Sequence, residues 1–125
     1  MIYSIGVDIV DVGRIGRVYG MYTDKFLMRV FSPDEISSLD VLSEDGAEEI
    51  AGRFAAKEAV MKALGHFFDS GVFLRDIEIM NRNGDRAAVR LPDGVADKLR
   101  GRRVLISISC QPNIALALAI IADEE

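Results

Sequence analysis

The sequence is poor in the residues that mark several large classes of protein. Cys110 is the only cysteine among 125 residues, so no internal disulfide can form and nothing points to an oxidising compartment. Lysine and arginine number 15 against 20 acidic residues, a net charge of −5. This balance argues against nucleic acid as the main partner, because binding a phosphate backbone needs clustered cations.

Targeting and catalytic signatures are also missing. No positively charged leader precedes an apolar run, and no apolar run is long enough to span a bilayer, so we expect a cytoplasmic chain without membrane contact. A Walker-type glycine loop is absent, which argues against a P-loop enzyme. No histidine–cysteine cluster suggests zinc, and the sole histidine, His66, has no identifiable partners for a serine-type triad.

What the sequence does have is apolar residues, which make up 50% of the chain. The length fits a single domain over residues 1–125. The apolar share exceeds what a monomer of this size needs, so part of the apolar surface is either buried between subunits or packed into a dense monomer core. Composition leaves both alternatives open.

The order of predicted elements indicates an α+β domain with a mostly antiparallel sheet and one long helix. Helices are predicted at 32–39, where Ser32, Pro33 and Glu35 form a capping signature, at 47–64 ending at Gly65, and at 92–100, with helical tendency over 13–29. Strands are predicted at 1–12, 74–80, 87–91, 104–109 and 114–121, with a hairpin turn at Asn83-Gly84. The last run has helix-favouring residues, but large and small side chains alternate with period two, which favours a buried strand.

Asp8 is the first residue that ordinary packing does not explain. It lies within an apolar strand, where aspartate is disfavoured and costly to bury unless it is paired or binds a metal. Gly6, two residues away on the same face, leaves space for a close approach. The alternative is that Asp8 points to solvent from a half-exposed strand.

Lys57 is the second such residue. Ile50, Phe54, Met61 and Leu64 form one apolar stripe on the long helix, and Lys57 projects into its middle. Either its ammonium reaches an anion or cavity, or it extends past the edge of the core.

Glu58 and Lys62 border that stripe four residues apart, which is also the spacing of an ordinary surface ion pair. Together with Asp8 they admit a functional interpretation. Two carboxylates with lysines suit a magnesium–phosphate site, since Mg²⁺ is often held by one or two carboxylates and substrate phosphates.

Two long motifs resemble signatures of the holo-acyl-carrier-protein synthases, a 4′-phosphopantetheinyl transferase family. The N-terminal motif is Gly6-Val7-Asp8-Ile9-Val10 followed by Arg14-Ile15. The central motif runs from Gly52-Arg53-Phe54-Ala55-Ala56-Lys57-Glu58-Ala59 through Lys62-Ala63-Leu64-Gly65. Asp76-Ile77-Glu78-Ile79, Asn83-Gly84 and Ser107-Ile108-Ser109 match later segments in the same order, so the resemblance covers nearly the whole chain.

The resemblance implies a small α+β domain that assembles as a homotrimer with active sites between subunits. It implies transfer of 4′-phosphopantetheine from coenzyme A to a serine of apo-acyl carrier protein, with release of adenosine 3′,5′-bisphosphate, in fatty acid biosynthesis. Asp8 and Glu58 match the positions that bind Mg²⁺, and Lys62 matches a lysine that contacts the phosphate at the scissile bond. Glu58 is the expected base, directly or through a water at the metal.

The resemblance also assigns binding surfaces. Arg53, Lys62, Gly65, Asn83 and Gly84 fall where the family lines the coenzyme A cleft. Arg14, Phe26 and Arg29 match the surface that receives the acidic carrier protein. The sequence does not decide which carriers are served, whether acylated coenzyme A is accepted, or whether Mn²⁺ replaces Mg²⁺.

Three positions depart from the family pattern. Cys110 replaces a histidine associated with the cofactor site, His66 interrupts a Gly-Thr-Gly segment, and Arg86 replaces a proline. We expect Cys110 to be a buried small residue and not a nucleophile. The changes at Cys110 and His66 suggest one rival interpretation, a degenerate relative that binds coenzyme A or carrier protein without transfer. A second rival, from the sequence pattern alone, is an unrelated magnesium-dependent phosphotransferase acting on a nucleotide.

Overall fold

The computed structural model describes residues 1–40, 45–65, 72–81 and 87–123. Its strands are β1 (Ile2–Asp11), β2 (Glu78–Asn81), β3 (Ala87–Arg90), β4 (Arg103–Cys110) and β5 (Ile114–Ala122). Its helices are α1 (Val12–Tyr22), α2 (Asp24–Val30), α3 (Pro33–Ser38), α4 (Gly46–Leu64) and α5 (Asp93–Lys98), with a short 3₁₀ turn η1 (Leu74–Asp76). The predicted α+β class is confirmed.

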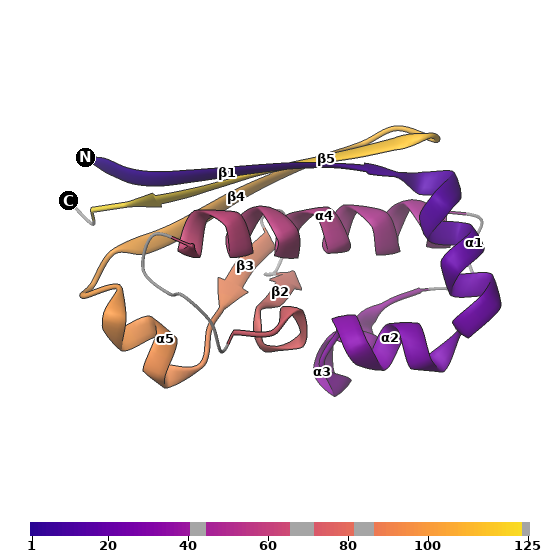
Figure 1. Ribbon diagram of the computed structural model, residues 1–125, viewed down its shortest axis with the longest axis horizontal. Helices are drawn as coiled ribbons and strands as arrows, with labels where there is room; N and C mark the ends of the chain where they lie inside the picture. Colours follow the sequence, from indigo (N-terminus) through magenta and orange to yellow (C-terminus); the bar gives the residue numbers. More distant parts are fainter. Residues whose placement is uncertain (41–44, 66–71, 82–86, 124–125) are drawn as a thin grey trace.

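Three layers make up the molecule (Figure 1). An antiparallel sheet in the order β1-β5-β4 forms one layer, and α4 lies across its inner face. On the other side of α4 lie α2, α3 and the separate β2–β3 pair, while α1 descends from the end of β1. The central motif on α4 is therefore enclosed between a sheet and a second layer, which buries most of the helix surface.

β5 is the central strand, which confirms the prediction from its period-two alternation. Ala115, Ala117 and Ala119 are fully buried toward α4, whereas Leu116 is 40% exposed on the other face. Small side chains on the inner face let the helix approach the sheet closely. Register therefore follows from side-chain size: alanine faces the helix and the larger apolar residues face outward.

β1 uses its two faces in an unexpected way. Its larger apolar residues, Ile5, Val7 and Ile9, are 54%, 46% and 63% exposed. The inner face instead carries Gly6, next to which α4 passes so closely that an added Cβ would lie 1.9 Å from the carbonyl oxygen of Ala59. Asp8 is on this inner face, two residues along the strand.

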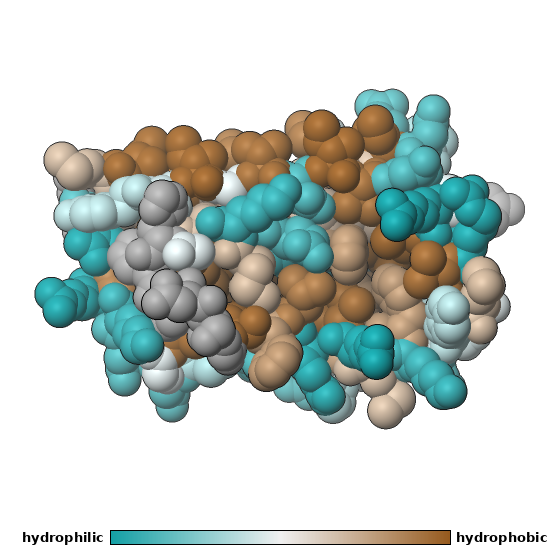
Figure 2. Space-filling view, in the orientation of Figure 1, coloured by the Kyte–Doolittle hydropathy of each residue, from teal (hydrophilic) through white to brown (hydrophobic). Residues whose placement is uncertain are grey.

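The outer sheet face is an apolar surface. Its exposed side chains include Ile5, Val7, Ile9, Leu105, Ile114 and Leu116. Figure 2 shows hydrophobic side chains along the upper edge of the molecule, above the sheet. Contiguous exposed apolar patches of this kind mark interaction surfaces.

Helix capping follows the predicted pattern around α3. Ser32 accepts a hydrogen bond from the amide of Glu35, and the Glu35 carboxylate accepts one from the amide of Ser32, a complete capping box. The long helix ends at Leu64, with Gly65 directly after it as predicted.

The prediction of a continuous strand over 74–80 is wrong in its first half. Residues 74–76 form η1, where the Asp76 side chain accepts a hydrogen bond from the amide of Phe73. This local side-chain contact offers the backbone an alternative to strand pairing. The strand begins at Glu78 and pairs antiparallel with β3, while the predicted turn at Asn83-Gly84 lies outside the described residues. Within the described part of the chain, no helix combines the length and apolar character needed to cross a bilayer.

Candidate active site

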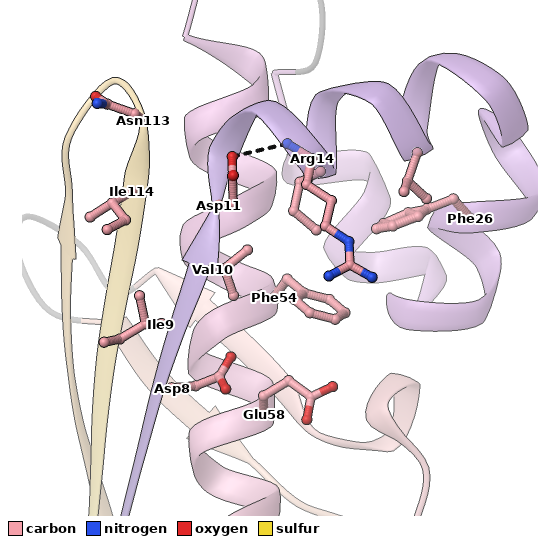
Figure 3. A pocket seen from close by; sticks show the side chains of 12 residues that line it. Asp8, Ile9, Val10, Asp11, Arg14, Phe26, Phe54, Glu58, Asn113 and Ile114 are labelled. Atoms are coloured by element: carbon pink, nitrogen blue, oxygen red, sulfur yellow. Dashed lines mark hydrogen bonds between the residues drawn. The ribbon is translucent and has the colours of Figure 1, made fainter.

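Asp8 and Glu58 come together from β1 and α4 at one end of a pocket (Figure 3). The Asp8 side chain is 16% exposed, which overturns the alternative that it points freely to solvent. Burial raises the pKa of Glu58, and the negative charge of Asp8 raises it further. The two carboxylates therefore repel each other when both are ionised, and a cation between them would offset that repulsion.

Lys62 supplies positive charge at the same point. Its Nζ lies 3.0 Å from Oδ1 of Asp8 and 3.0 Å from the carbonyl oxygen of Val7. This contact joins the end of α4 to β1. The spacing of Glu58 and Lys62 in the sequence had suggested that these two residues form an ion pair, but the structure pairs Lys62 with Asp8. Lys62 also opposes the rise in the pKa of Glu58.

The pocket beside these residues has a volume of about 810 Å³. It is lined by Asp8, Ile9, Val10, Asp11, Arg14, Ile15, Val18, Phe26, Phe54, Glu58, Asn113 and Ile114. The lining comes from β1, α1, α2, α4 and the start of β5 (Figure 3). The two carboxylates thus border a hollow that is apolar along one wall and open to a larger ligand.

The donor set fits a magnesium site shared with a substrate. Among the residues that the structure describes, no group of three or more histidine, cysteine, aspartate or glutamate side chains could hold a metal alone. Asp8 and Glu58 offer two hard oxygen donors, and their mutual repulsion favours a divalent cation. Mg²⁺ keeps several waters and is completed by substrate phosphates, so two carboxylates suffice.

Arg14 and Phe26, predicted to bind the partner, both line the pocket. The ring of Phe26 lies 6.2 Å from that of Phe54, which is one helical turn before Glu58 on α4, so the two rings form an apolar wall beside Glu58 (Figure 3). Arg29 is exposed on the last turn of α2, outside the pocket lining. The structure thus brings two of the three predicted partner residues to the pocket.

Arg53 and Lys57 point into the protein. Arg53 is 7% exposed, and its Nη1 donates to the carbonyl oxygen of Ile79 at 2.6 Å. Lys57 is fully buried and pairs with Glu35, which overturns the alternative that it extends past the edge of the core. The anion that Lys57 reaches belongs to the protein itself. Burial lowers the pKa of Lys57, and the hydrogen bond to Glu35 opposes that effect.

The remaining predicted positions divide into two groups. Gly65 follows the last turn of α4, three residues after Lys62, and its amide donates to the carbonyls of Met61 and Lys62. Asn83, Gly84, His66 and Arg86 lie outside the described residues. Their assignments remain predictions.

Cys110 is exposed, so the expectation that it is buried is wrong. It ends β4, one of the two edge strands of the three-stranded sheet, and its Sγ lies 3.7 Å from the carbonyl oxygen of Glu48. Partial burial of the thiol raises its pKa, with a smaller contribution from the charge of Glu48. A raised thiol pKa disfavours the nucleophilic thiolate, which agrees with a non-catalytic role.

Sequence reasoning missed several pocket residues. Asp11 accepts a hydrogen bond from the amide of Arg14 and caps α1, and an acidic residue before a helix was the available signal. Asn113 enters the pocket because its carbonyl accepts a hydrogen bond from the amide of Val12. That contact between the two chain segments is set by tertiary structure, and no local pattern marks it.

Comparisons with known proteins agree with this site. Residues 4–118 match the family model described as the 4′-phosphopantetheinyl transferase superfamily. The holo-[acyl-carrier-protein] synthase of Pelodictyon phaeoclathratiforme is 44% identical over 94% of this chain and 97% of its own length. That of Orientia tsutsugamushi is 36% identical over 98% of both chains.

Solved structures extend the likeness to three dimensions. The Helicobacter pylori holo-[acyl-carrier-protein] synthase, in complex with coenzyme A, superposes with a TM-score of 0.81 at 33% identity, over 94% of this chain and 99% of the other. The Neisseria meningitidis protein gives a TM-score of 0.83 at 29% identity, over 98% and 100%. With both signature motifs converging on one pocket, the chain belongs to the 4′-phosphopantetheinyl transferase superfamily and, within it, to the holo-[acyl-carrier-protein] synthases.

Proposed function

We propose that this protein transfers 4′-phosphopantetheine from coenzyme A to a serine of apo-acyl carrier protein and releases adenosine 3′,5′-bisphosphate. The observation that carries the proposal is the meeting of Asp8 and Glu58, remote in sequence, beside a pocket with Lys62 at its edge. The likeness to a relative solved with coenzyme A supports the choice of donor. We place the reaction in the cytoplasm and in fatty acid biosynthesis.

Asp8 and Glu58 would hold Mg²⁺, which neutralises pyrophosphate charge and polarises the phosphorus under attack when it is bound. The serine oxygen forms a bond to the β-phosphorus as the bond to the leaving bisphosphate breaks. Glu58 accepts the serine proton; its raised pKa brings it closer to the range in which a base works at neutral pH. Lys62, whose side chain is 55% exposed, stabilises the negative charge on the leaving group.

We further propose that the carrier protein approaches along α1 and α2. Arg14 and Phe26 line the open side of the pocket, and Arg29 is exposed on the adjoining surface. These cations suit an acidic partner even though the whole chain carries a net charge of −5. Lys62, Gly65, Asn83 and Gly84 are proposed to line the coenzyme A cleft, as the family resemblance implies. Arg53, which the resemblance also assigns to this cleft, is 7% exposed and is proposed to support the lining from within the protein.

The outer face of the sheet is proposed to join three copies into a homotrimer. Six large apolar side chains there are at least 40% exposed, and an isolated chain would leave them in water. Ile9 and Ile114 belong both to this face and to the pocket lining, so a neighbouring subunit packed on the sheet would reach the pocket. The active sites therefore stand between subunits.

The test is to incubate the protein with apo-acyl carrier protein, coenzyme A and Mg²⁺ and to weigh the carrier. A mass gain of one phosphopantetheine supports transfer. Binding of coenzyme A without that gain would favour the degenerate relative, and binding of ATP in place of coenzyme A would favour a nucleotide phosphotransferase.

Asp8→Asn and Glu58→Gln keep side-chain size but remove the charge, so each should abolish transfer while the variant stays folded. The measurement is the same carrier mass, together with thermal unfolding of each variant. Glu48→Gln, an acidic residue of the same helix outside the pocket lining, is the matched control and should keep the wild-type rate. Full activity in either site variant would overturn the metal assignment.

A further inference from the structure

A buried ion pair lies directly behind the candidate active site. Lys57 and Glu35 are 0% and 1% exposed, and Nζ of Lys57 lies 2.5 Å from Oε1 of Glu35. The ammonium also donates to the carbonyl oxygens of Leu74 at 2.9 Å and Ile77 at 2.5 Å. Its three protons therefore have three acceptors.

The Glu35 carboxylate is equally well satisfied. Its Oε1 accepts a hydrogen bond from the amide of Ser32 at 3.0 Å, and its Oε2 accepts one from the amide of Ile79 at 2.9 Å. The ammonium of Lys57 also stands 5.1 Å from the centre of the Phe31 ring, within the range of a cation–π contact. Through these contacts the pair fastens residues 31–35 and 74–79 to α4.

Stability alone does not account for such a pair. Desolvation of two buried charges offsets most of their attraction, and apolar side chains of similar volume often fold as stably. What apolar side chains lack is direction: the pair fixes five polar contacts with defined donors and acceptors. Its contribution is therefore geometric.

The geometry that it fixes includes one wall of the pocket. Phe31 and Ser32 continue directly from α2, which carries Phe26. On α4, Lys57 is three residues after Phe54, so the two side chains leave neighbouring parts of the helix surface. Lys57 thereby anchors the chain segment that places Phe26 against Phe54 (Figure 3).

We propose that Lys57 and Glu35 are a positioning pair for the carrier protein. They hold α2 and α3 on α4, and this sets the position of the α1–α2 wall that the carrier contacts. The inference rests on the proposed function and deepens it, because it separates residues that shape the carrier surface from Asp8, Glu58 and Lys62, which act on the phosphate.

The test uses the charge-neutral double variant Glu35→Gln/Lys57→Met in steady-state transfer assays. We expect the KM for apo-carrier protein to rise about tenfold, which corresponds to a loss of about 1.4 kcal/mol of binding free energy. The KM for coenzyme A and the kcat at saturating carrier should stay within about twofold of wild type, the pattern of lost ground-state binding. A purely structural role would lower the amount of folded enzyme and leave both KM values unchanged.

Asp34→Asn is the matched control. Asp34 precedes Glu35 on α3 and its side chain is 71% exposed, so it loses the same charge outside the buried pair and should keep both KM values. Glu35→Asp keeps the charge opposite Lys57 but shortens the side chain, so it should raise the carrier KM in the same direction and serves if the double variant does not fold. In the wild-type chain, amides of α2 and α3 should exchange hydrogen more slowly once apo-carrier is added.

Unchanged carrier KM, an equal rise in both KM values, a fall in kcat alone, or unaltered hydrogen exchange in α2 and α3 would each overturn the proposal. If the wild-type protein transfers phosphopantetheine and the variants have the same KM values as wild type, only the positioning role is refuted. A wild-type protein that transfers nothing refutes the proposed function instead.

Discussion

Gly6→Ala tests how the fold brings Asp8 to Glu58. A Cβ at position 6 would lie 1.9 Å from the carbonyl oxygen of Ala59 and 2.8 Å from the amide nitrogen of Ala63. Both atoms belong to the backbone of α4 and cannot rotate away. Since ordinary contact begins at 3.4 Å, strand and helix must separate by about 1.5 Å.

That displacement should change the distance between Asp8 and Glu58, because the contact between Gly6 and Ala59 lies beside both residues. Gly6 is two residues from Asp8 on the inner face of β1, and Ala59 is next to Glu58 on α4. Misplacement by about 1 Å can cost about 100-fold in rate, so we expect kcat to fall by about that factor. Overpacking should also lower the free energy of unfolding by about 1–3 kcal/mol.

The assay is steady-state transfer over a range of Mg²⁺ concentrations, with thermal unfolding measured on the same samples. Gly6→Ala should need more Mg²⁺ for half-maximal rate, because its two carboxylates no longer sit at the right separation. Gly94→Ala in α5 is the matched control: an added Cβ there meets nothing within 4 Å, so rate and Mg²⁺ dependence should be unchanged. Wild-type kcat and Mg²⁺ dependence in a folded Gly6→Ala variant would refute the reasoning.

Two further predictions concern assembly and acid stability. Ile5→Lys places a charge on the outer sheet face, so light scattering should show a smaller particle than wild type, and the rate of transfer should fall. Met21→Lys on α1 is the control and should leave the particle size unchanged. An Ile5→Lys assembly as large as the wild-type one would contradict the proposed interface. Hydrogen bonds from Arg90 hold the pKa of Glu78 below its unfolded value of 4.5, so its stabilising contribution is present above that pH and is lost as pH falls through the folded pKa. Glu78→Gln should therefore be less stable than wild type at pH 7 in urea titrations, and this difference in the free energy of unfolding should shrink as the pH falls below 4.5. A pH-independent difference would argue against this ion pair.

Local patterns in the sequence were enough to predict most of the secondary structure. The Ser32–Glu35 capping box and the long helix from residue 46 depend on contacts within a few residues, so the chain specifies them before it folds. Alternation of alanine with larger residues likewise specified β5 as a strand, although those residues favour helix. The prediction of a strand from residue 74 was wrong because the amide of Phe73 donates a hydrogen bond to the side chain of Asp76, and this contact closes a turn there.

Resemblance to two signature motifs predicted the family and the candidate catalytic residues from the sequence alone, because both motifs are long runs of specific residues at fixed spacing. The match of residues 4–118 to the family model confirms the family. Which face of β1 is buried was decided only in the tertiary structure. Both faces carry apolar residues, and the close approach of α4 at Gly6 turned the larger ones outward.

The partners of charged residues also required the fold. Lys57 finds Glu35, and Lys62 finds Asp8, across 22 and 54 positions of the chain. Nothing in the local sequence encodes such pairs, because each exists only once α4 is enclosed between the sheet and the second layer. The sequence thus determined which groups are candidates for the chemistry, and packing around α4 determined where each one points.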